Sequence, residues 1–257
     1  MLVDSHCHLD AGEFDDDRDE VVARARAAGV TRQVVPAIHA AGWPKLRAIC
    51  AGTDGLFPAY GLHPMFLAEH RPRHLSQLRD WIERERPVAV GECGLDYFVE
   101  GLDHHAQQRY FEGQLALARE HGLPVIVHAR RAVDAVIASI RAVGGLRGVV
   151  HSWAGSRQQA AQLWDLGFLL GVGGPVTYER ASRLRKLVAG MPLEHLLLET
   201  DAPDQPDSRI RGERNEPARL RTVCETIADL RGVSTEEVAR ATSANAQRLF
   251  GLPPVPA

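Results

Sequence analysis

The feature that most constrains the fold of this chain is an alternation of short apolar runs with longer amphipathic stretches, repeated eight times. The apolar runs are LVDSH, RQVVPA, GLFPAYGLHP, PVAVGECGLD, LPVIVHA, RGVVHSW, FLLGVGG and EHLLLETDAP. Near-continuous apolar runs are typical of parallel strands that are buried on both faces. In the first amphipathic stretch, Val21, Val22, Ala25 and Ala28 share one helical face and Gly29 marks the end. Eight such units in 257 residues predict an α/β protein, a closed (β/α)8 TIM barrel.

The expected helices cover the segments between these runs. They span residues 15–29, 41–52, 74–86, 103–122, 133–145, 156–167 and 182–191, and two further helices follow at about 216–231 and 234–249. A doubly wound open sheet is the competing arrangement, but no Gly-x-Gly-x-x-Gly follows a strand. Because no linker rich in Pro, Gly or Ser divides the chain, we expect a single domain over residues 1–257.

Charge and cysteine usage narrow the classes of function and location. The formal net charge of −3 provides no broad basic field for tight binding to duplex DNA, although local contacts to nucleic acid stay open. Cys7, Cys50, Cys93 and Cys224 lie far apart without a Cys-x-x-Cys pair, as expected of free thiols in a reducing cytosol. The sequence has no secretory signal and no run of about 18 apolar residues. We therefore expect a cytoplasmic monomer without a membrane span.

Reactive side chains fall at the carboxyl ends of the predicted strands. They are His6 and His8 in the first strand, His63 in the third, Glu92 in the fourth, His128 in the fifth, His151 in the sixth and Asp201 in the eighth. Strand ends ring one face of a barrel, where barrel enzymes place their sites. Each residue alone has a structural explanation, because a strand-end histidine is more often hydrogen-bonded than a ligand and a carboxylate can cap a helix. Their convergence favours a functional site.

The types of side chain in this set indicate a metal site. Side chains two apart on a strand share a face, so His6 and His8 can reach one cation while Cys7 points away. Neutral imidazoles and carboxylates suit Zn, Mn, Ni or Fe, whereas sites made only of oxygen are more typical of Mg. Burying the acids without a cation would be costly.

A shared carboxylate allows two divalent metal ions per subunit, drawn from Zn, Mn, Mg, Ni or Co. Glu92, on a middle strand, is the natural bridge. The first ion would be held by His6, His8 and Asp201 and the second by His128 and His151. Two ions roughly 3.5–4 Å apart lower the pKa of a shared water, and Asp201 could take its proton as general base.

Further side chains are candidates for contacts to substrate. His63 could bind a substrate phosphate or steady a leaving group, although holding the His-Pro turn explains it almost as well. Guanidinium groups suit phosphate oxygens, although loop arginines are usually solvated. The predicted phosphate contacts are Arg130, Arg209 and Arg211. Tyr97 and Phe98 could stack a base or pack at the rim. The expected catalytic side chains are Asp201, Glu92 and His63.

Together these segments resemble the TatD-like metal-dependent hydrolases of the amidohydrolase-type barrels, often described as deoxyribonucleases. The matching stretches, in order, are DSHCHLD, YGLHP, VGECGLDYF, PVIVHARR, VVHSWAGS, GVGG, LLLETDAP, RGERNEPA and ANAQRLFGL. The resemblance implies a (β/α)8 barrel and, for members that act on DNA, phosphodiester hydrolysis from the 3′ end with Mg or Mn. It carries metal-ligand roles to His6, His8, Glu92, His128, His151 and Asp201.

The chain departs from the family pattern near the predicted mouth of the site, at Ser152 and Trp153 and at Asp204 and Asp207 in the loop after the eighth strand. These departures leave the metal chemistry intact and bear on the substrate. We predict a deoxyribonuclease for single-stranded or 3′-end DNA. The alternatives are a hydrolase of another ester, amide or small phosphate, including aminoacyl esters on RNA, and a metal-binding barrel without turnover. Histidinol-phosphatase-like phosphoesterases also begin with a His-x-His strand, but the single Glu of GECGLD and the ETDAP ending favour the TatD-like family.

Overall fold

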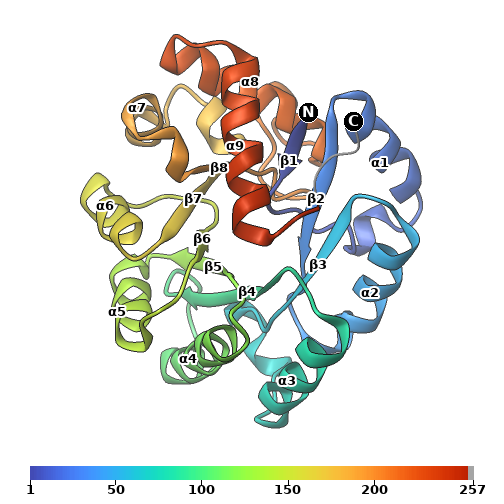
Figure 1. Ribbon diagram of the computed structural model, residues 1–257, viewed down its shortest axis with the longest axis vertical. Helices are drawn as coiled ribbons and strands as arrows, with labels where there is room; N and C mark the ends of the chain where they lie inside the picture. The colour runs from blue at the N-terminus through green and yellow to red at the C-terminus, as the bar shows by residue number, and fades with distance from the viewer. Residues whose placement is uncertain (254–257) are drawn as a thin grey trace.

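The computed structural model describes residues 1–253 and shows eight parallel strands arranged around one axis, with helices outside them (Figure 1). The strands are β1 (Leu2–Asp4), β2 (Val30–Pro36), β3 (Leu56–Tyr60), β4 (Ala89–Asp96), β5 (Val125–Arg130), β6 (Gly148–Val150), β7 (Phe168–Val172) and β8 (Leu196–Leu198). Their order in the sheet is their order in the chain. The predicted (β/α)8 fold is therefore confirmed.

One α-helix follows each of the strands β1 to β7, and two follow β8. The α-helices are α1 (Arg18–Ala27), α2 (Trp43–Gly52), α3 (Arg73–Glu85), α4 (His104–His121), α5 (Val133–Val143), α6 (Arg157–Asp165), α7 (Ser182–Gly190), α8 (Leu220–Arg231) and α9 (Thr235–Phe250). Short 3-10 helices are η1 (Gly12–Phe14), η2 (Ala40–Gly42), η3 (Pro64–Glu69), η4 (Gly174–Thr177), η5 (Leu193–His195), η6 (Ser208–Ile210) and η7 (Pro217–Arg219). None of the helices within residues 1–253 is long and apolar enough to cross a bilayer.

The ends of the helices follow from local chemistry. In α4, the Asp103 side chain accepts the N–H groups of His105 and Ala106, and Gly122 ends the helix with a φ of 64°. Two helices begin at least three residues later than predicted. The predicted helix at 15–29 begins at Arg18, because Asp17 has a φ of −139° outside the helical range. The predicted helix at about 216–231 begins at Leu220, since the 3-10 turn η7 comes first.

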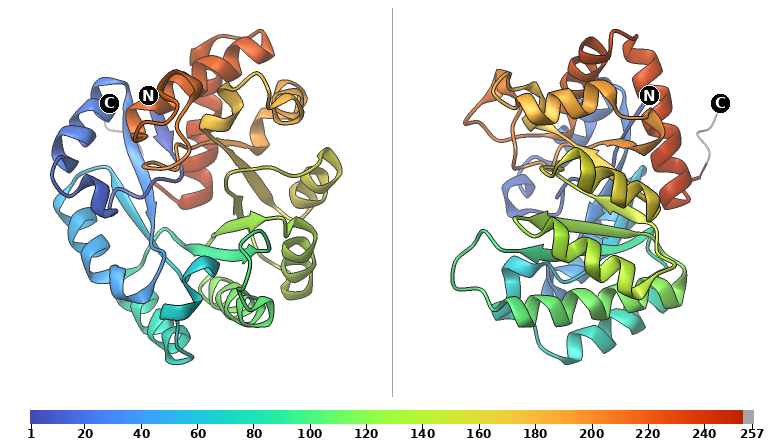
Figure 2. Two further views of the ribbon diagram at one scale, coloured as in Figure 1. Left: turned by 180° about the vertical axis from the view of Figure 1, so that it is seen from behind. Right: turned by 90° about the vertical axis from the view of Figure 1, so that its left-hand side faces the viewer.

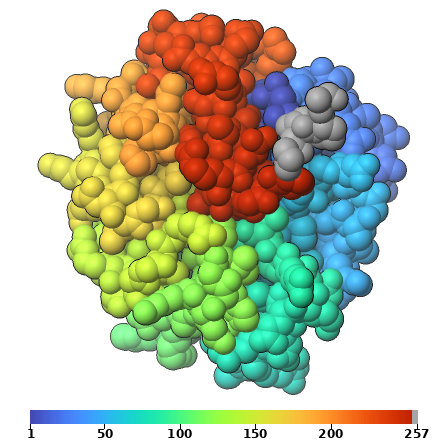
Figure 3. All heavy atoms as spheres, viewed as in Figure 1, coloured from blue at the N-terminus to red at the C-terminus, as the bar shows by residue number. Residues whose placement is uncertain are grey.

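Helix α9 closes one end of the barrel. The last turns of α9 pack there against apolar residues from the interior of the strands. The residues of this apolar cluster are Val3, Val34, Ala59, Ala89, Ile126, Val149 and Leu197 from the strands, and Ala246, Leu249, Phe250 and Leu252 from α9 and the residues after it. The Asn245 amide donates to the carbonyls of Leu193 and Leu196, which fixes α9 to the start of β8. Figures 1 and 3 show α9 across the middle of this face. The amino ends of the strands are thus packed shut, and the carboxyl ends remain for a site.

The seam between β8 and β1 is held by side chains as well as by backbone. The Ser5 N–H donates to the Leu198 carbonyl at 2.9 Å, and the Asp4 carboxylate accepts both the N–H and the hydroxyl of Thr200, at 3.0 and 2.6 Å. Asp4 is completely buried, and this burial raises its pKa to about 7 against the opposing effect of the Thr200 hydroxyl bond. The seam therefore depends on a buried carboxyl group whose hydrogen bonds are supplied by the strand it joins.

We predict that Thr200→Val destabilises the protein by about 1–3 kcal/mol, because it leaves a buried Asp4 oxygen without its hydroxyl donor. Urea unfolding of metal-free protein measures the change. Thr226→Val is the control, since the Thr226 hydroxyl bonds only to a carbonyl of its own helix, and it should change stability by less than about 0.5 kcal/mol. Equal effects of the two substitutions would refute the role given to the Asp4–Thr200 pair.

Candidate metal centre

The carboxyl ends of the strands meet at the end of the barrel opposite α9 (Figure 2). There the structure brings together the whole predicted set, His6, His8, His63, Glu92, His128, His151 and Asp201. Two positions were predicted wrongly, because Glu92 and His128 lie inside β4 and β5 and not at their ends. The register between β4 and β5 shifts between Val90 and Cys93, and this irregularity accompanies the inward direction of Glu92.

Two glycines in the GECG segment allow this backbone path. Gly91 and Gly94 have φ angles of 148° and 147°, a region that favours glycine. A Cβ at Gly91 would lie 2.7 Å from the Ile126 carbonyl oxygen, and one at Gly94 would lie 2.0 Å from the His128 carbonyl oxygen. The glycines around Glu92 are therefore required for close approach to β5.

One oxygen of Glu92 faces the side chains from β1 and β8. Glu92 Oε2 lies 3.2 Å from His6 Nε2 and 3.5 Å from His8 Nε2. Asp201 Oδ1 lies 3.3 and 3.5 Å from the same two nitrogens. Two imidazole nitrogens and two carboxylate oxygens thus converge on one point.

The other oxygen of Glu92 faces histidines that follow β3 and β6 and one within β5. Glu92 Oε1 lies 3.0 Å from His63 Nε2, 3.2 Å from His128 Nδ1 and 2.8 Å from His151 Nε2. Glu92 is only 2% exposed, so its carboxylate is surrounded by imidazoles. It therefore divides the cluster into two groups, with one oxygen for each.

Second hydrogen bonds fix which nitrogen of two histidines faces the centre. His8 Nδ1 donates to the Pro36 carbonyl at 3.2 Å, and His128 Nε2 donates to Asp96 Oδ2 at 2.9 Å. In the neutral rings this leaves the lone pairs of His8 Nε2 and His128 Nδ1 directed at Glu92. Such carboxylate or carbonyl partners are usual behind histidines that bind metals.

His63 has the opposite arrangement. Its Nδ1 accepts the N–H of Met65 at 3.2 Å, at the start of η3. The proton of the neutral ring therefore resides on Nε2, which donates to Glu92 Oε1. His63 thus provides a hydrogen-bond donor to the centre, whereas the neutral rings of His8 and His128 provide lone pairs.

Asp96 was missed in the sequence, although its signal was present. Asp96 is four residues after Glu92 on the same strand, so both side chains lie on the same face. It is completely buried, and its Oδ1 accepts the N–H groups of Phe98 and Val99 while Oδ2 accepts from His128. Asp96 is therefore rigidly placed to orient His128.

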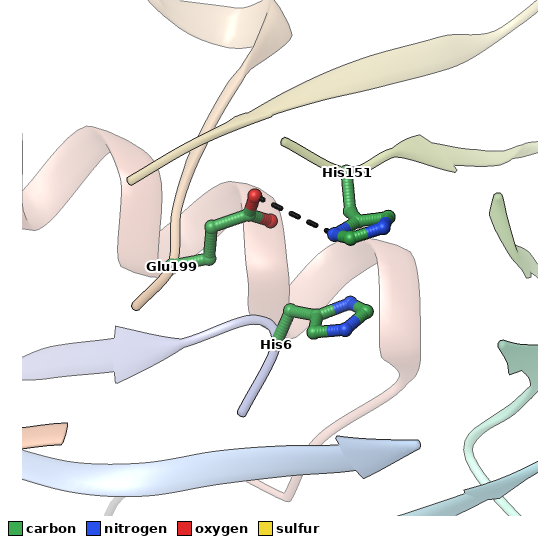
Figure 4. A group of neighbouring side chains, drawn as sticks. All are labelled: His6, His151 and Glu199. Atoms are coloured by element: carbon green, nitrogen blue, oxygen red, sulfur yellow. Dashed lines mark ion pairs between the residues drawn. The ribbon is translucent and has the colours of Figure 1, made fainter. Parts of the chain in front are cut away.

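Glu199 is the second acidic residue that the sequence analysis missed. It is two residues before Asp201 in LLLETD, and Figure 4 shows its carboxylate directed toward His151 beside His6. Its Oε1 accepts the Ser152 N–H at 2.5 Å and lies 3.8 Å from His151 Nδ1. Burial raises its pKa to about 8. Within residues 1–253, three groups are close enough to hold a metal ion: His6, His151 and Glu199; His6, His8 and Glu92; and His63, Glu92 and His128.

The backbone beside Asp201 is unusual. Asp201, Ser152 and Gln205 have φ angles of 58°, 46° and 52°, in the left-handed region that costs energy for residues other than glycine. They are joined by hydrogen bonds, because the Gln205 amide donates to Asp201 Oδ2 at 2.5 Å and also contacts the Ser152 hydroxyl. Strained residues held by their surroundings cluster at functional sites.

The charges of the metal-free cluster balance internally. Burial lowers the pKa of His6 to about 4. At His8 and His151 burial acts the same way, but Asp201 and Glu92 outweigh it and raise the pKa values to about 9 and about 10. Burial would raise the pKa values of both carboxyl groups, yet the surrounding imidazoles hold them well below their usual range. Protons on His8 and His151 thus neutralise the carboxylates. Imidazole nitrogens and carboxylates converging in this way fit a divalent metal ion.

The predicted substrate contacts are less uniform. The Arg130 and Arg131 guanidinium groups lie 3.7 and 4.6 Å from the ring centre of Phe98, which is 43% exposed. Tyr97 packs against His104 instead, with ring centres 4.1 Å apart.

In the loop after β8, some charged side chains are exposed and others form ion pairs within the protein. Arg209 and Arg211 are exposed, and neither contacts the cluster among the interactions described. Arg214 is engaged elsewhere, since it binds Asp17 at 2.6 Å. Asp207 is buried and binds Arg219 at 2.6 Å, so this departure from the family pattern is structural.

The barrel and its cluster of histidines and carboxylates define a metal-dependent hydrolase. The sequence model of the family described as TatD related DNase matches residues 3–251, so the chain belongs to that family. It is 40% identical to the uncharacterized metal-dependent hydrolase YjjV of Escherichia coli K12, over 98% of each chain. The crystal structure of that TatD homologue superposes with a TM-score of 0.93, at 39% identity and 98% coverage of both chains. A Pantoea ananatis relative named 3′-5′ ssDNA/RNA exonuclease TatD is 36% identical, over 98% of this chain and 100% of its own.

We predict that metal binding releases protons at pH 7.5. Both His8 and His151 hold a proton there, because their pKa values are about 9 and about 10, and each must lose it to bind a metal. Affinity should therefore weaken as the pH falls below these values. Titration calorimetry with Mn²⁺ in buffers of different ionisation enthalpy counts the protons released. Binding without proton release would contradict the charge pattern.

We also predict that Asp96→Asn weakens metal binding about 10–100-fold. Because Oδ1 is fixed by two backbone N–H groups, the new amide nitrogen would face His128 Nε2 and favour the tautomer with its proton on Nδ1. Competition with a chromophoric chelator measures the affinity. The exposed Asp80→Asn is the matched control. A change below twofold in Asp96→Asn would exclude this orienting role.

Proposed function

We propose that the protein is a nuclease that uses two divalent metal ions per subunit to hydrolyse phosphodiester bonds at the 3′ end of single-stranded DNA. This proposal rests on the position of Glu92, because its two carboxylate oxygens face two separate groups of donors. The ligands for one ion would be His6, His8, Asp201 and Glu92 Oε2. The ligands for the other would be His128, His151 and Glu92 Oε1. When bound, such ions polarise the phosphoryl oxygen and lower the pKa of the attacking water.

Side chains of the protein would accept and donate the protons of the reaction. Asp201 has its Oδ2 held by Gln205 and its Oδ1 directed into the cluster, so it is placed to accept a proton from the attacking water. His63 presents the N–H of Nε2 and is placed to donate a hydrogen bond to a phosphate oxygen or to the leaving oxygen. These two groups lie on opposite sides of Glu92, as acid and base functions require.

Support for a nucleic-acid substrate comes from the rim of the site. Phe98 with Arg130 and Arg131 forms an exposed surface of one aromatic ring and two guanidinium groups, which we call the Phe98 platform. Bases stack on such rings and phosphates bind such cations. The relative named 3′-5′ ssDNA/RNA exonuclease TatD is consistent with a single-stranded substrate.

We expect the metal-loaded protein to shorten a 5′-labelled oligonucleotide stepwise from its 3′ end in at least one of Mg²⁺, Mn²⁺, Zn²⁺ and Co²⁺. Glu92→Gln should lower the rate at least about 10³-fold, because it removes the shared negative charge while keeping the shape. Gel electrophoresis of the products measures both, and metal content by mass spectrometry should fall in the variant.

Glu194→Gln is the matched control and should retain the wild-type rate. Glu194 is exposed and precedes β8, whereas Asp201 and the cluster follow it. Normal turnover in Glu92→Gln would refute the shared carboxylate. If the wild type leaves the oligonucleotide intact with every metal but hydrolyses p-nitrophenyl esters or lactones, the substrate is another ester and the nuclease proposal is wrong.

A further inference from the structure

A second feature beside the metal centre is a cavity of about 310 Å³ at the carboxyl ends of β6 and β7. Its walls include Ser152, Trp153, Gly173, Arg180 and Arg183. The volume is at the lower end of the range for small-molecule sites, about 300–1,000 Å³. It would therefore accommodate a group of the size of one nucleotide and not a longer segment.

Ser152 connects this cavity with the metal centre. It follows His151 directly in the chain, and its N–H donates to Glu199 Oε1 at 2.5 Å. Its hydroxyl contacts Gln205, whose amide donates to Asp201. Gly173 borders Glu199 as well, since a Cβ there would lie 2.9 Å from the Glu199 carbonyl oxygen. Cavity and centre thus share a wall, and one substrate could occupy both.

The cavity carries positive charge that no carboxylate neutralises within residues 1–253. Arg180 and Arg183 are both exposed, and neither forms an ion pair in the described part of the chain. Arg180 lies 5.3 Å from the ring centre of Tyr178. By contrast, Arg185 on the same helix donates to the Val176 carbonyl and is occupied structurally.

Trp153 forms part of the wall of the cavity. It is 3% exposed, and its indole N–H is buried without a hydrogen-bond partner among the described residues, so it does not reach the cavity surface. The donors at the cavity are therefore the two exposed guanidinium groups of Arg180 and Arg183, which suit a phosphate group.

We propose that this cavity binds the phosphate and sugar of the nucleotide adjacent to the bond that is cut. This assignment rests on the proposed nuclease function. The Phe98 platform lies after β4 and β5 and the cavity lies after β6 and β7, so the two surfaces occupy neighbouring sectors of the rim that carries the metal centre. A strand would reach the centre with one nucleotide on the platform and the next in the cavity.

The test is binding of fluorescein-labelled hexathymidylate to metal-free protein, followed by anisotropy at several salt concentrations. Arg180→Ala combined with Arg183→Ala should raise Kd at least tenfold. It should also reduce the slope of log K against log salt by about 0.7, since the cavity holds one phosphate and each phosphate contact to a single strand contributes about 0.7. Lys186→Ala is the matched control, because Lys186 is an exposed cation on α7 that does not line the cavity.

Each outcome decides the proposal. An equal loss in Lys186→Ala would show general attraction and overturn it, as would unchanged binding in the double variant or no binding by the wild type. Measuring cleavage of the oligonucleotide in the presence of metal then distinguishes the cavity proposal from the nuclease proposal. Arg-dependent binding without cleavage would leave the cavity assignment standing and refute the nuclease. Cleavage with the same KM in the double variant would leave the nuclease standing and refute the cavity.

Discussion

The structure depends on one buried carboxylate. Glu92 is almost inaccessible to water, and an ionised carboxylate in such a place is tolerated only when positive charge or hydrogen-bond donors surround it. The donors come from residues after β1, β3 and β6 and from within β5, so they meet Glu92 only when the barrel has closed. The same closure that satisfies Glu92 also assembles the metal centre. The site therefore forms only when the barrel folds, and a metal ion that binds the folded state should stabilise the fold.

The two ends of the barrel differ in what their side chains do: one end is packed with apolar residues, and the other holds the cluster of histidines and carboxylates. At the amino ends of the strands, α9 and the interior apolar side chains provide dense packing without polar groups that need partners. At the carboxyl ends, buried acids, imidazoles and left-handed residues such as Asp201 all raise the free energy of the metal-free fold. Between them, Asp4 joins β1 to β8 through Thr200 directly before Asp201. The packed end thus adjoins the strained end, and the Asp4–Thr200 hydrogen bonds join β1 to the residue that directly precedes Asp201.

Most of the fold and the central cluster could be predicted from the sequence, because both depend on local periodicity and on where strands end. His6, His8, His128 and His151 follow or end apolar runs, and a barrel brings such positions together. The residues that were missed act through long-range partners. The spacing of Asp96 from Glu92 places it on the same face of its strand, but its role depends on His128, and Glu199 is recognisable only once Ser152 is beside it. Arg214 shows the reverse case, because nothing local reveals that Asp17, 197 residues away in sequence, engages it.

The distribution of charge is compatible with the proposed action on a polyanion at a net charge of −3. Long-range attraction of a single strand is weak at such a charge, so affinity must come from a few contacts near the reacting bond. The Phe98 platform and the cavity lined by Arg180 and Arg183 place cations at two neighbouring points of the rim of the centre. The centre beside them has its own carboxylates balanced by imidazolium groups or by metal ions, so it does not repel the phosphate. Contacts confined to the neighbouring nucleotides favour a strand end over a duplex interior, because an end can enter a closed-sided barrel mouth without bending.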